Sequence, residues 1–339
     1  MTEQSDAVVV PSPQEAKEQL EQALFEIRRV IAGQDAMLER VLVCLLAQGH
    51  LLIEGVPGLA KTLTIKTTAG VLGGSFARVQ FTPDLVPSDL VGTRIYRAGD
   101  AAFDTELGPV FCNFLLADEI NRAPAKVQSA LLEVMQERQV TIGHDTFPVP
   151  DPFLVMATQN PIESEGTYPL PEAQIDRFML KVVIGYPQHD EELTVVQRQL
   201  VEAPVLREAL SLENLKALQR ATFDIYVDPA LVSYAVDIAT ATREPAAHGL
   251  GDVAPYISYG ASPRGPISLV HGSRALALIR GREYALVEDL QALARDALRH
   301  RLVLSYQALA EEVSPDELLD QVLAAVPAPR LDLAGENAA

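Results

Sequence analysis

The octapeptide GVPGLAKT, residues 55–62, constrains the fold of this chain more than any other segment. It directly follows the apolar run Leu51-Leu52-Ile53. An apolar strand that breaks into a glycine-rich loop and then a helix is typical of a phosphate site, because the loop N–H groups and the helix N-terminus point at the anion. The pattern predicts that Lys61 reaches the β- and γ-phosphates of a nucleotide and that the Thr62 hydroxyl is a ligand of Mg²⁺.

The loop departs from the usual phosphate-loop pattern at one position, where Ala60 replaces the last glycine. Gly55 and Gly58 keep the backbone freedom of the loop, so Ala60 needs only to avoid a positive φ. The predicted phosphate-binding segment is completed by three further residues: Val56, Pro57 and Leu59. The same residues could also form an ordinary strand–turn–helix, so the residues that follow decide whether this segment is a phosphate loop.

Composition indicates a globular protein and argues against a nucleic-acid partner. The chain has 339 residues, 48% of them hydrophobic and 22% charged, which allows one large or two moderate domains. Its formal net charge is −19, and no run of Lys and Arg is longer than a pair. Such an acidic surface repels a phosphate backbone unless basic residues cluster locally.

Cysteine usage and hydropathy indicate the compartment. Cys44 and Cys112 lie in apolar segments without a C-x-x-C pair, which favours buried, reduced thiols. The N-terminal residues lack the basic and apolar regions of a signal peptide. Apolar runs fall short of the roughly 18 residues that a membrane helix needs. We therefore expect a soluble cytoplasmic protein that does not insert into membranes.

The first half of the chain predicts an α/β domain over residues 12–187, after a loose tail over 1–11. Ser12-Pro13-Gln14-Glu15 is typical of a helix-capping box. Heavily apolar strands separated by helices indicate a five-stranded parallel sheet that is buried on both faces, with strands near 50–54, 76–81, 114–117, 153–157 and 178–184. Residues 82–110, rich in Pro, Asp and Gly, are expected to form an insert, and 139–149 a β-hairpin.

Beyond Pro187 the strand pattern disappears and the chain becomes helical. Apolar residues at helical spacing predict a separate helical domain over 188–327, interrupted by a Gly/Pro-rich loop at 244–262, and 328–339 are expected to be a tail. The expected helices cover residues 188–202, 212–221, 228–242, 263–280, 286–298 and 315–325.

Polar residues at two strand ends supply candidate chemistry. Asp118 and Glu119 end an apolar strand, at the edge where parallel sheets bind ligands. We expect Asp118 to hold Mg²⁺ through water and Glu119 to act as the general base for the attacking water. Asn160 ends the next strand, where a neutral amide can orient that water. The alternatives are a solvated acidic turn and an Asn-Pro turn.

Two arginines are candidates for stabilising transition-state charge. Arg177 stands at the entrance to the fifth strand and could act on the γ-phosphate of a neighbouring subunit, or form an ion pair with Asp176 or Glu172. Arg264 begins a helix after Ser262-Pro263, where a cation opposes the helix dipole. A phosphate between the domains would stabilise it, and so would a glutamate or a carbonyl.

In this order, the phosphate loop and the segments LLADEIN, ATQNP, PEAQIDRF and GASPRG resemble those of the MoxR group of AAA+ ATPases. The resemblance runs from about Gly33 to Tyr306. It implies an αβα nucleotide domain with a helical lid, ATP and Mg²⁺ as cofactors, and a homo-oligomeric ring, usually a hexamer. Its implied roles are Walker A for Lys61 and Thr62, Walker B for Asp118 and Glu119, sensor 1 for Asn160, arginine finger for Arg177, sensor 2 for Arg264, and adenine contact for Gly33 and Gln34.

The resemblance also implies a biological role. We expect an ATP-driven, chaperone-like remodeller or activator of a protein client, working with a separate protein that carries a von Willebrand factor A (VWA) domain. The insert and the hairpin would face the pore or the partner. Alternatives are a magnesium-chelatase-like motor subunit, a nucleic-acid motor with a helix-2 insert, and a scaffold that binds nucleotide without hydrolysis. The hairpin turn 143–146 lacks Lys and Arg, which argues against the nucleic-acid motor.

Overall fold

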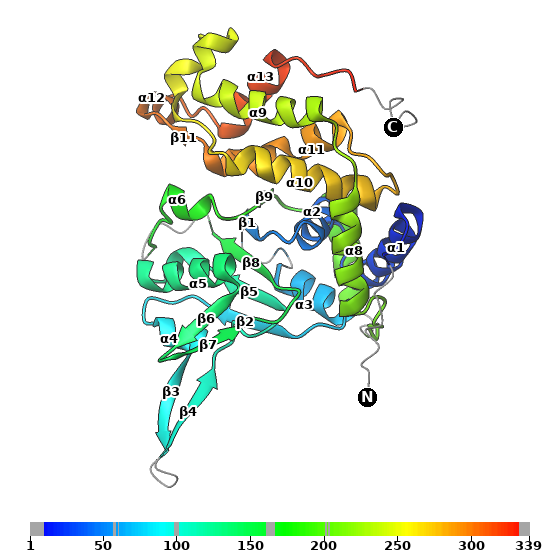
Figure 1. Cartoon of the computed structure of the whole chain (residues 1–339), viewed down its shortest axis with the longest axis vertical. Coiled ribbons are helices and arrows are strands. Elements are labelled where there is room, and N and C mark those ends of the chain that lie inside the picture. The colour runs from blue at the N-terminus through cyan, green and yellow to red at the C-terminus, as the bar shows by residue number, and fades with distance from the viewer. Residues whose placement is uncertain are drawn as a thin grey trace.

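The computed structural model describes residues 10–56, 59, 61–97, 102–160, 167–200, 202 and 204–331. An α/β part carries the N-terminal half of the chain, and a helical part lies against one side of it (Figure 1). A long two-stranded hairpin projects from the α/β part on the side away from the helical part. This arrangement confirms the predicted fold class.

The α/β part is built on a five-stranded parallel sheet in the order β2-β5-β8-β1-β9. The predicted strands were therefore correct to within a few residues at each end. Their bounds are β1 Leu51–Gly55, β2 Phe76–Gln80, β5 Phe114–Asp118, β8 Leu154–Gln159 and β9 Leu180–Ile184. Because all five run the same way, the residues after β1, β5 and β8 meet at one edge of the sheet.

The three central strands, β5, β8 and β1, are apolar on both faces because each face covers a separate core. In β1, Leu51 and Ile53 pack into one cluster with the helical part, while Leu52 packs into the other. The second cluster is closed by α5 (Ala125–Glu137) and by the hairpin of β6 (Gln139–Ile142) and β7 (Asp145–Pro148). This two-sided burial is the reason why alternation is absent from the strand sequences.

The first helix of the α/β part begins where the sequence supplies a cap. The predicted capping box forms between Ser12 and Glu15. The bounds are α1 Pro13–Val30, α2 Asp35–Leu46, α3 Lys61–Val71, η1 Ile120–Arg122, α5 Ala125–Glu137 and α6 Glu172–Ile175.

The predicted insert contains regular structure that its composition did not indicate. It forms α4 Pro87–Val91 and an antiparallel hairpin of β3 Gly92–Arg97 and β4 Ala102–Leu107. The hairpin predicted at 139–149 is confirmed, as β6 Gln139–Ile142 and β7 Asp145–Pro148. Both hairpins lie on the same side of the sheet (Figure 1).

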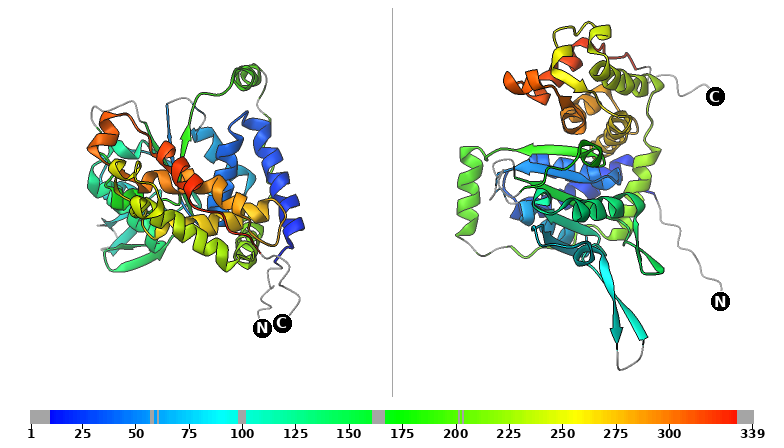
Figure 2. Two further views of the ribbon diagram at one scale, coloured as in Figure 1. Left: turned by 90° about the horizontal axis from the view of Figure 1, so that it is seen from above. Right: turned by 90° about the vertical axis from the view of Figure 1, so that its left-hand side faces the viewer.

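The helical part begins after β9 and contains the helices that the sequence predicts, together with shorter elements that it does not. The first helix, α7, stands apart from the helices that cover the sheet (Figure 2). The bounds are α7 His189–Gln199, α8 Leu212–Asp224, α9 Pro229–Arg243, η2 Pro245–His248, η3 Ala254–Tyr256, β10 Ile257–Tyr259, α10 Arg264–Ile279, α11 Val287–Leu298, η4 Arg299–Arg301, β11 Val303–Leu304, α12 Tyr306–Ala310 and α13 Pro315–Ala325.

One hydrophobic cluster runs from the sheet into the helical part without a break, joining strand residues to α8, α9, α10, α11 and α13. Because this core is continuous, it marks no boundary between the two predicted domains, and the boundary at 187/188 stays a prediction. In the part of the chain that the structure describes, no helix is long and apolar enough to span a membrane. Both cysteines, Cys44 and Cys112, are buried free thiols as predicted, and burial raises the pKa of each, to about 12 for Cys112.

Candidate nucleotide site

The phosphate loop follows β1 and leads directly into α3, whose first residue is Lys61. The Lys61 ammonium turns back and donates to the Gly55 carbonyl oxygen. Burial lowers the pKa of Lys61, while the carboxylates of Asp118, Glu119 and Glu54 oppose that shift. Three of the predicted loop residues, Pro57, Gly58 and Ala60, lie outside the described residues.

A cavity of about 440 Å³ lies beside this loop. Its volume is within the usual range for small-molecule sites. It brings together most of the residues that the sequence analysis placed at this edge of the sheet: Gly55, Leu59, Lys61, Thr62, Asp118, Glu119 and Asn160. The predicted convergence of the ends of β1, β5 and β8 is thus what the structure shows.

The acidic pair is held from β8 by a single hydroxyl. Thr158 donates to Oδ1 of Asp118 at 2.6 Å and accepts from the backbone N–H of Glu119 at 2.9 Å. Asp118 Oδ2 pairs with Arg78 at 2.7 Å. The carboxylate of Asp118 is therefore oriented by two neighbouring strands, β8 and β2.

Glu119 occupies an unusual backbone conformation. Its φ is 56°, in the left-handed region that L-residues rarely adopt. Strain of this kind persists where the surroundings fix the residue, often at functional sites. Its Oε2 accepts from Gln80 Nε2 at 2.7 Å and lies 3.0 Å from Arg122 Nε. The carboxylate that we predict to be the base is thus held in one orientation beside the cavity.

The donor set around Asp118 fits Mg²⁺. Thr62 and Asp118 line the same cavity and offer a hydroxyl and a carboxylate oxygen. These are hard oxygen ligands, which Mg²⁺ prefers together with waters and substrate phosphates. Lys61, which is half-buried, lines the same cavity and is placed to meet the negative charge of those phosphates.

Gly33 and Gln34 are not among the described residues that line this cavity. They form the α1–α2 turn, and both have positive φ. A Cβ built on Gly33 would lie 2.9 Å from the Glu191 carboxyl carbon, so the turn packs closely against the first turn of α7. Their predicted contact with adenine remains a prediction.

Arg177 and Arg264 lie together, but not at the phosphate loop. They line a second cavity, of about 230 Å³, next to Asp176, Arg301 and Met179. Arg177 precedes β9, and β9 starts beside the first residue of β1. A five-residue strand spans about 17 Å, so Arg177 is at the opposite sheet edge from the loop after β1. Asp176, the alternative partner of Arg177, pairs with Arg301 at 2.8 Å instead.

Sequence reasoning missed four residues that touch the acidic pair: Arg78, Gln80, Arg122 and Thr158. Gln80 is the register partner of Asp118 across β2 and β5. Had the strand order been known, the polar residues at the end of β2 would have been expected at this edge. Arg122 follows Glu119 by one helical turn and could have been found from its spacing.

Comparison with known proteins agrees with this geometry. The model of the "ATPase family associated with various cellular activities (AAA)" matches residues 50–180, which carry the phosphate loop and both polar strand ends. The model of the AAA lid domain matches residues 251–322. The protein is an AAA+ ATPase, an enzyme that binds ATP and hydrolyses it to ADP and phosphate.

Its relatives narrow the class. The chain is 56% identical to "Chaperone MoxR1" of Mycobacterium tuberculosis over 92% of this chain and 83% of that protein. It is 33% identical to "Protein MoxR" of Paracoccus denitrificans over 88% of this chain and 93% of that protein. A crystal structure from Cytophaga hutchinsonii covers 94% of this chain and 97% of that one, at 44% identity and a TM-score of 0.89. The chain belongs to the MoxR family of AAA+ ATPases.

Proposed function

We propose that this protein works as a Mg²⁺-dependent ATPase ring, a hexamer, that remodels or activates a protein client. The observation that carries the ring is the separation of the two halves of the site. Lys61, Asp118 and Glu119 share one cavity, whereas Arg177 and Arg264 share another at the opposite sheet edge. In a head-to-tail ring, the second edge of one subunit would face the first edge of its neighbour. Each ATP would then be bound by one subunit and reached by the arginines of the next.

Within this proposal the roles of the residues follow from their places. Lys61 binds the β- and γ-phosphates, and Thr62 with Asp118, the latter through water, holds Mg²⁺, which neutralises charge on the phosphate oxygens. Glu119 accepts a proton from the attacking water, which Asn160 orients. Arg177 and Arg264 stabilise the charge that develops on the γ-phosphate, Arg264 acting across the interface rather than on its own subunit.

The client role rests on the family and on the surface of the insert. The M. tuberculosis relative is called a chaperone. On the β3–β4 hairpin, Tyr96 and Phe103 form a cross-strand pair with ring centroids 5.2 Å apart and are 55% and 62% exposed. Exposed aromatic pairs of this kind favour contact with a protein surface. We place client contact there, and we expect a separate VWA-domain protein as partner.

Buried, reduced Cys44 and Cys112 support a cytoplasmic location.

A magnesium-chelatase-like motor is an alternative that would use the same nucleotide chemistry and differ only in its client. The arginines on the β3–β4 hairpin are engaged within it, Arg97 with Asp104 at 2.5 Å and Arg94 over the Phe103 ring. That engagement is a further argument against a nucleic-acid motor.

The proposed ring can be tested by measuring Mg²⁺-dependent ATP turnover per subunit over a wide range of protein concentration. If each site is completed by a neighbour, turnover per subunit rises steeply with concentration and levels off once rings have formed. Analytical ultracentrifugation with ATP should show assembly over the same range. A rate per subunit that is constant while the protein remains monomeric would contradict the ring.

A further inference from the structure

The turn η4 connects the helical lid to the segment that carries Arg177. Three consecutive residues of this turn bind backbone carbonyl groups of the segment that leads from Arg177 into β9. Arg299 donates to Lys181 O at 3.0 Å, and His300 Nε2 lies 3.0 Å from Phe178 O. Arg301 donates to Phe178 O at 2.8 Å and to Met179 O at 3.2 Å.

Arg301 is the centre of these contacts. Its side chain is only 1% exposed, and its guanidinium also donates to Asp176 Oδ1 at 2.8 Å and Asp176 O at 3.1 Å. A planar guanidinium can serve several acceptors at fixed angles, which an ammonium group cannot do. The backbone on both sides of Arg177 is therefore held from the lid by one side chain.

Asp176 connects the same network to Arg264. The Ser262 hydroxyl lies 2.9 Å from both carboxylate oxygens of Asp176 and accepts from the backbone N–H of Arg264 at 3.1 Å. Burial and the neighbouring Arg264 lower the pKa of Arg301, and Asp176 opposes that shift. Asp176 is the one carboxylate among the described residues that line the cavity with Arg177, Arg264 and Arg301, so it offsets part of their mutual repulsion.

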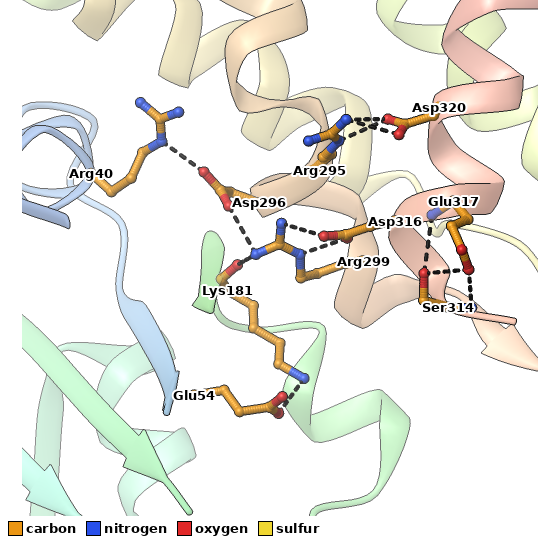
Figure 3. A network of polar contacts seen from close by, with 10 residues as sticks. All are labelled: Arg40, Glu54, Lys181, Arg295, Asp296, Arg299, Ser314, Asp316, Glu317 and Asp320. Carbon is orange, nitrogen blue, oxygen red and sulfur yellow. Dashed lines mark hydrogen bonds and ion pairs between the residues drawn. The ribbon is translucent and has the colours of Figure 1, made fainter. Parts of the chain in front are cut away.

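The network continues from the lid to the strand that carries the phosphate loop. Figure 3 shows Arg299 between Asp296 and Asp316, with Arg40 of α2 on the other side of Asp296. Lys181, whose carbonyl accepts from Arg299, pairs through its ammonium with Glu54 of β1 at 2.7 Å. Glu54 directly precedes the first glycine of the loop.

We propose that Arg301, acting through Asp176 and Ser262, is a positioning residue that holds Arg177 and Arg264 as one rigid pair for the neighbouring subunit. The proposal rests on the proposed trans role of these arginines. Neither Asp176, Ser262 nor Arg301 lines the phosphate-loop cavity, so their loss should leave ATP binding by their own subunit intact. What should fall is turnover, because a misplacement of about 1 Å in a reacting group can cost about a hundredfold in rate.

The test uses Asp176→Asn, which keeps the size of the side chain but removes its charge, and Ser262→Ala, which removes one oxygen. We expect Asp176→Asn to lower turnover about tenfold to a hundredfold and Ser262→Ala by less, each with an unchanged Kd for ATP. Asp289→Asn is the matched control. Asp289 is also a buried partner of arginines, Arg280 and Arg282, but within the lid. It should lose thermal stability without losing turnover per folded subunit.

Mixed assemblies separate positioning from a general loss of structure. Asp176→Asn subunits retain Glu119, and Glu119→Gln subunits retain the arginine pair, so their mixture should hydrolyse ATP faster than either parent. Arg177→Ala mixed with Glu119→Gln is the reference. If the reference recovers activity and the Asp176→Asn mixture does not, or if Asp176→Asn turns over like Asp289→Asn, the positioning role is wrong. If the reference also fails to recover, the trans role of Arg177 fails and the positioning role with it.

Discussion

At the scale of single residues, neighbouring side chains fix both the backbone and the carboxylate of Glu119. Its left-handed φ of 56° follows from the sharp exit of the chain after β5, and its N–H is fixed by Thr158. The side chain is then held by Gln80 and Arg122 at the rim of the cavity. A glutamine has the same shape and can keep these positions, but it cannot accept a proton from water.

Glu119→Gln should therefore retain ATP and lose turnover by about a hundredfold or more, as expected when a positioned base is removed. Equilibrium binding of ATP and steady-state turnover of the same sample measure the two properties. Glu213→Gln, on the exposed first turn of α8, is the control for removing one charge. Turnover near that of the control would remove Glu119 from its role as base.

His50 sets a pH dependence of stability. It is buried, accepts from Val155 N–H through Nδ1 at 3.0 Å, and lies 3.1 Å from Met135 O through Nε2. Burial, with help from Arg138, lowers its pKa to about 3, and burial also lowers the pKa of His300. Unfolded histidines instead take up a proton as the pH falls below about 6.5. Stability is thus complete above that pH and declines as the pH falls toward 3, by up to about 1.4 kcal/mol per pH unit for each histidine.

The measurement is the free energy of unfolding between pH 7.5 and 5. His50→Gln should be less stable than the parent at pH 7.5, because it loses the fitted ring, but its stability should fall less steeply with pH. His144→Gln, which changes an exposed histidine, should keep the slope of the parent. An equal slope in His50→Gln and the parent would show that His50 does not remain neutral in the folded protein.

At the scale of elements, the sequence predicts what depends on continuous burial and misses what depends on contacts distant in the chain. The central strands β5, β8 and β1 are apolar on both faces, and the apolar residues of the long lid helices recur at helical spacing, so both were found. In β3–β4, Tyr96 and Phe103 pair at the surface with Arg94 over the Phe103 ring, and no side chain described in these two strands is buried. The β10–β11 pair joins residues far apart in sequence, such as Ile257 and Leu304, and each strand is too short to show a period.

The same limit applies to the site. The ends of β1, β5 and β8 could be placed together because strands of a parallel sheet share an edge. Asp176 pairs with Arg301 rather than with the adjacent Arg177, and this pairing depends on how the lid packs against the sheet. No local spacing in the sequence encodes that docking.

The segment between β9 and α7 is an element that the sequence did not assign. At one end, a Cβ on Gly55 would lie 2.7 Å from the Ile184 carbonyl oxygen, and at the other Glu191 packs on Gly33. The segment thus runs from the phosphate loop to the turn where adenine is expected. It carries Tyr186, which is 76% exposed. If adenine lies there, the Tyr186 ring should be close to it.

The chain contains no tryptophan, so Tyr186→Trp would carry a single indole. Its fluorescence should change on titration with ATP and change much less with inorganic tripolyphosphate, which lacks the base. Tyr306→Trp, at a position that is 92% exposed on α12 of the lid, should respond to neither ligand. Equal responses of Tyr186→Trp to both ligands would place the base elsewhere.

At the scale of the whole molecule, Lys61, Asp118 and Glu119 line one cavity while Arg177 and Arg264 line another, and in the proposed ring a neighbouring subunit would bring the two sets together. This arrangement makes a quantitative prediction for mixed rings of Arg177→Ala and Glu119→Gln subunits. An active site between two subunits needs Glu119, which the Arg177→Ala subunits retain, and Arg177, which the Glu119→Gln subunits retain. With random mixing and independent interfaces, the productive fraction is the product of the two subunit fractions, and it peaks near equal amounts at about a quarter of the parent rate.

Turnover measured across the full range of mixing ratios should therefore trace a symmetric curve that falls to the low rates of the two variants at its ends. A peak well below a quarter would indicate that one site hydrolyses ATP only when neighbouring sites are also active. Independent sites would give a rate equal to the product of the two subunit fractions. A flat line at the low rates of the two variants would mean that Arg177 serves its own subunit, across the length of a strand from the phosphate loop. The geometry of β1 and β9 argues against that outcome, since Arg177 and the loop leave the sheet at opposite edges.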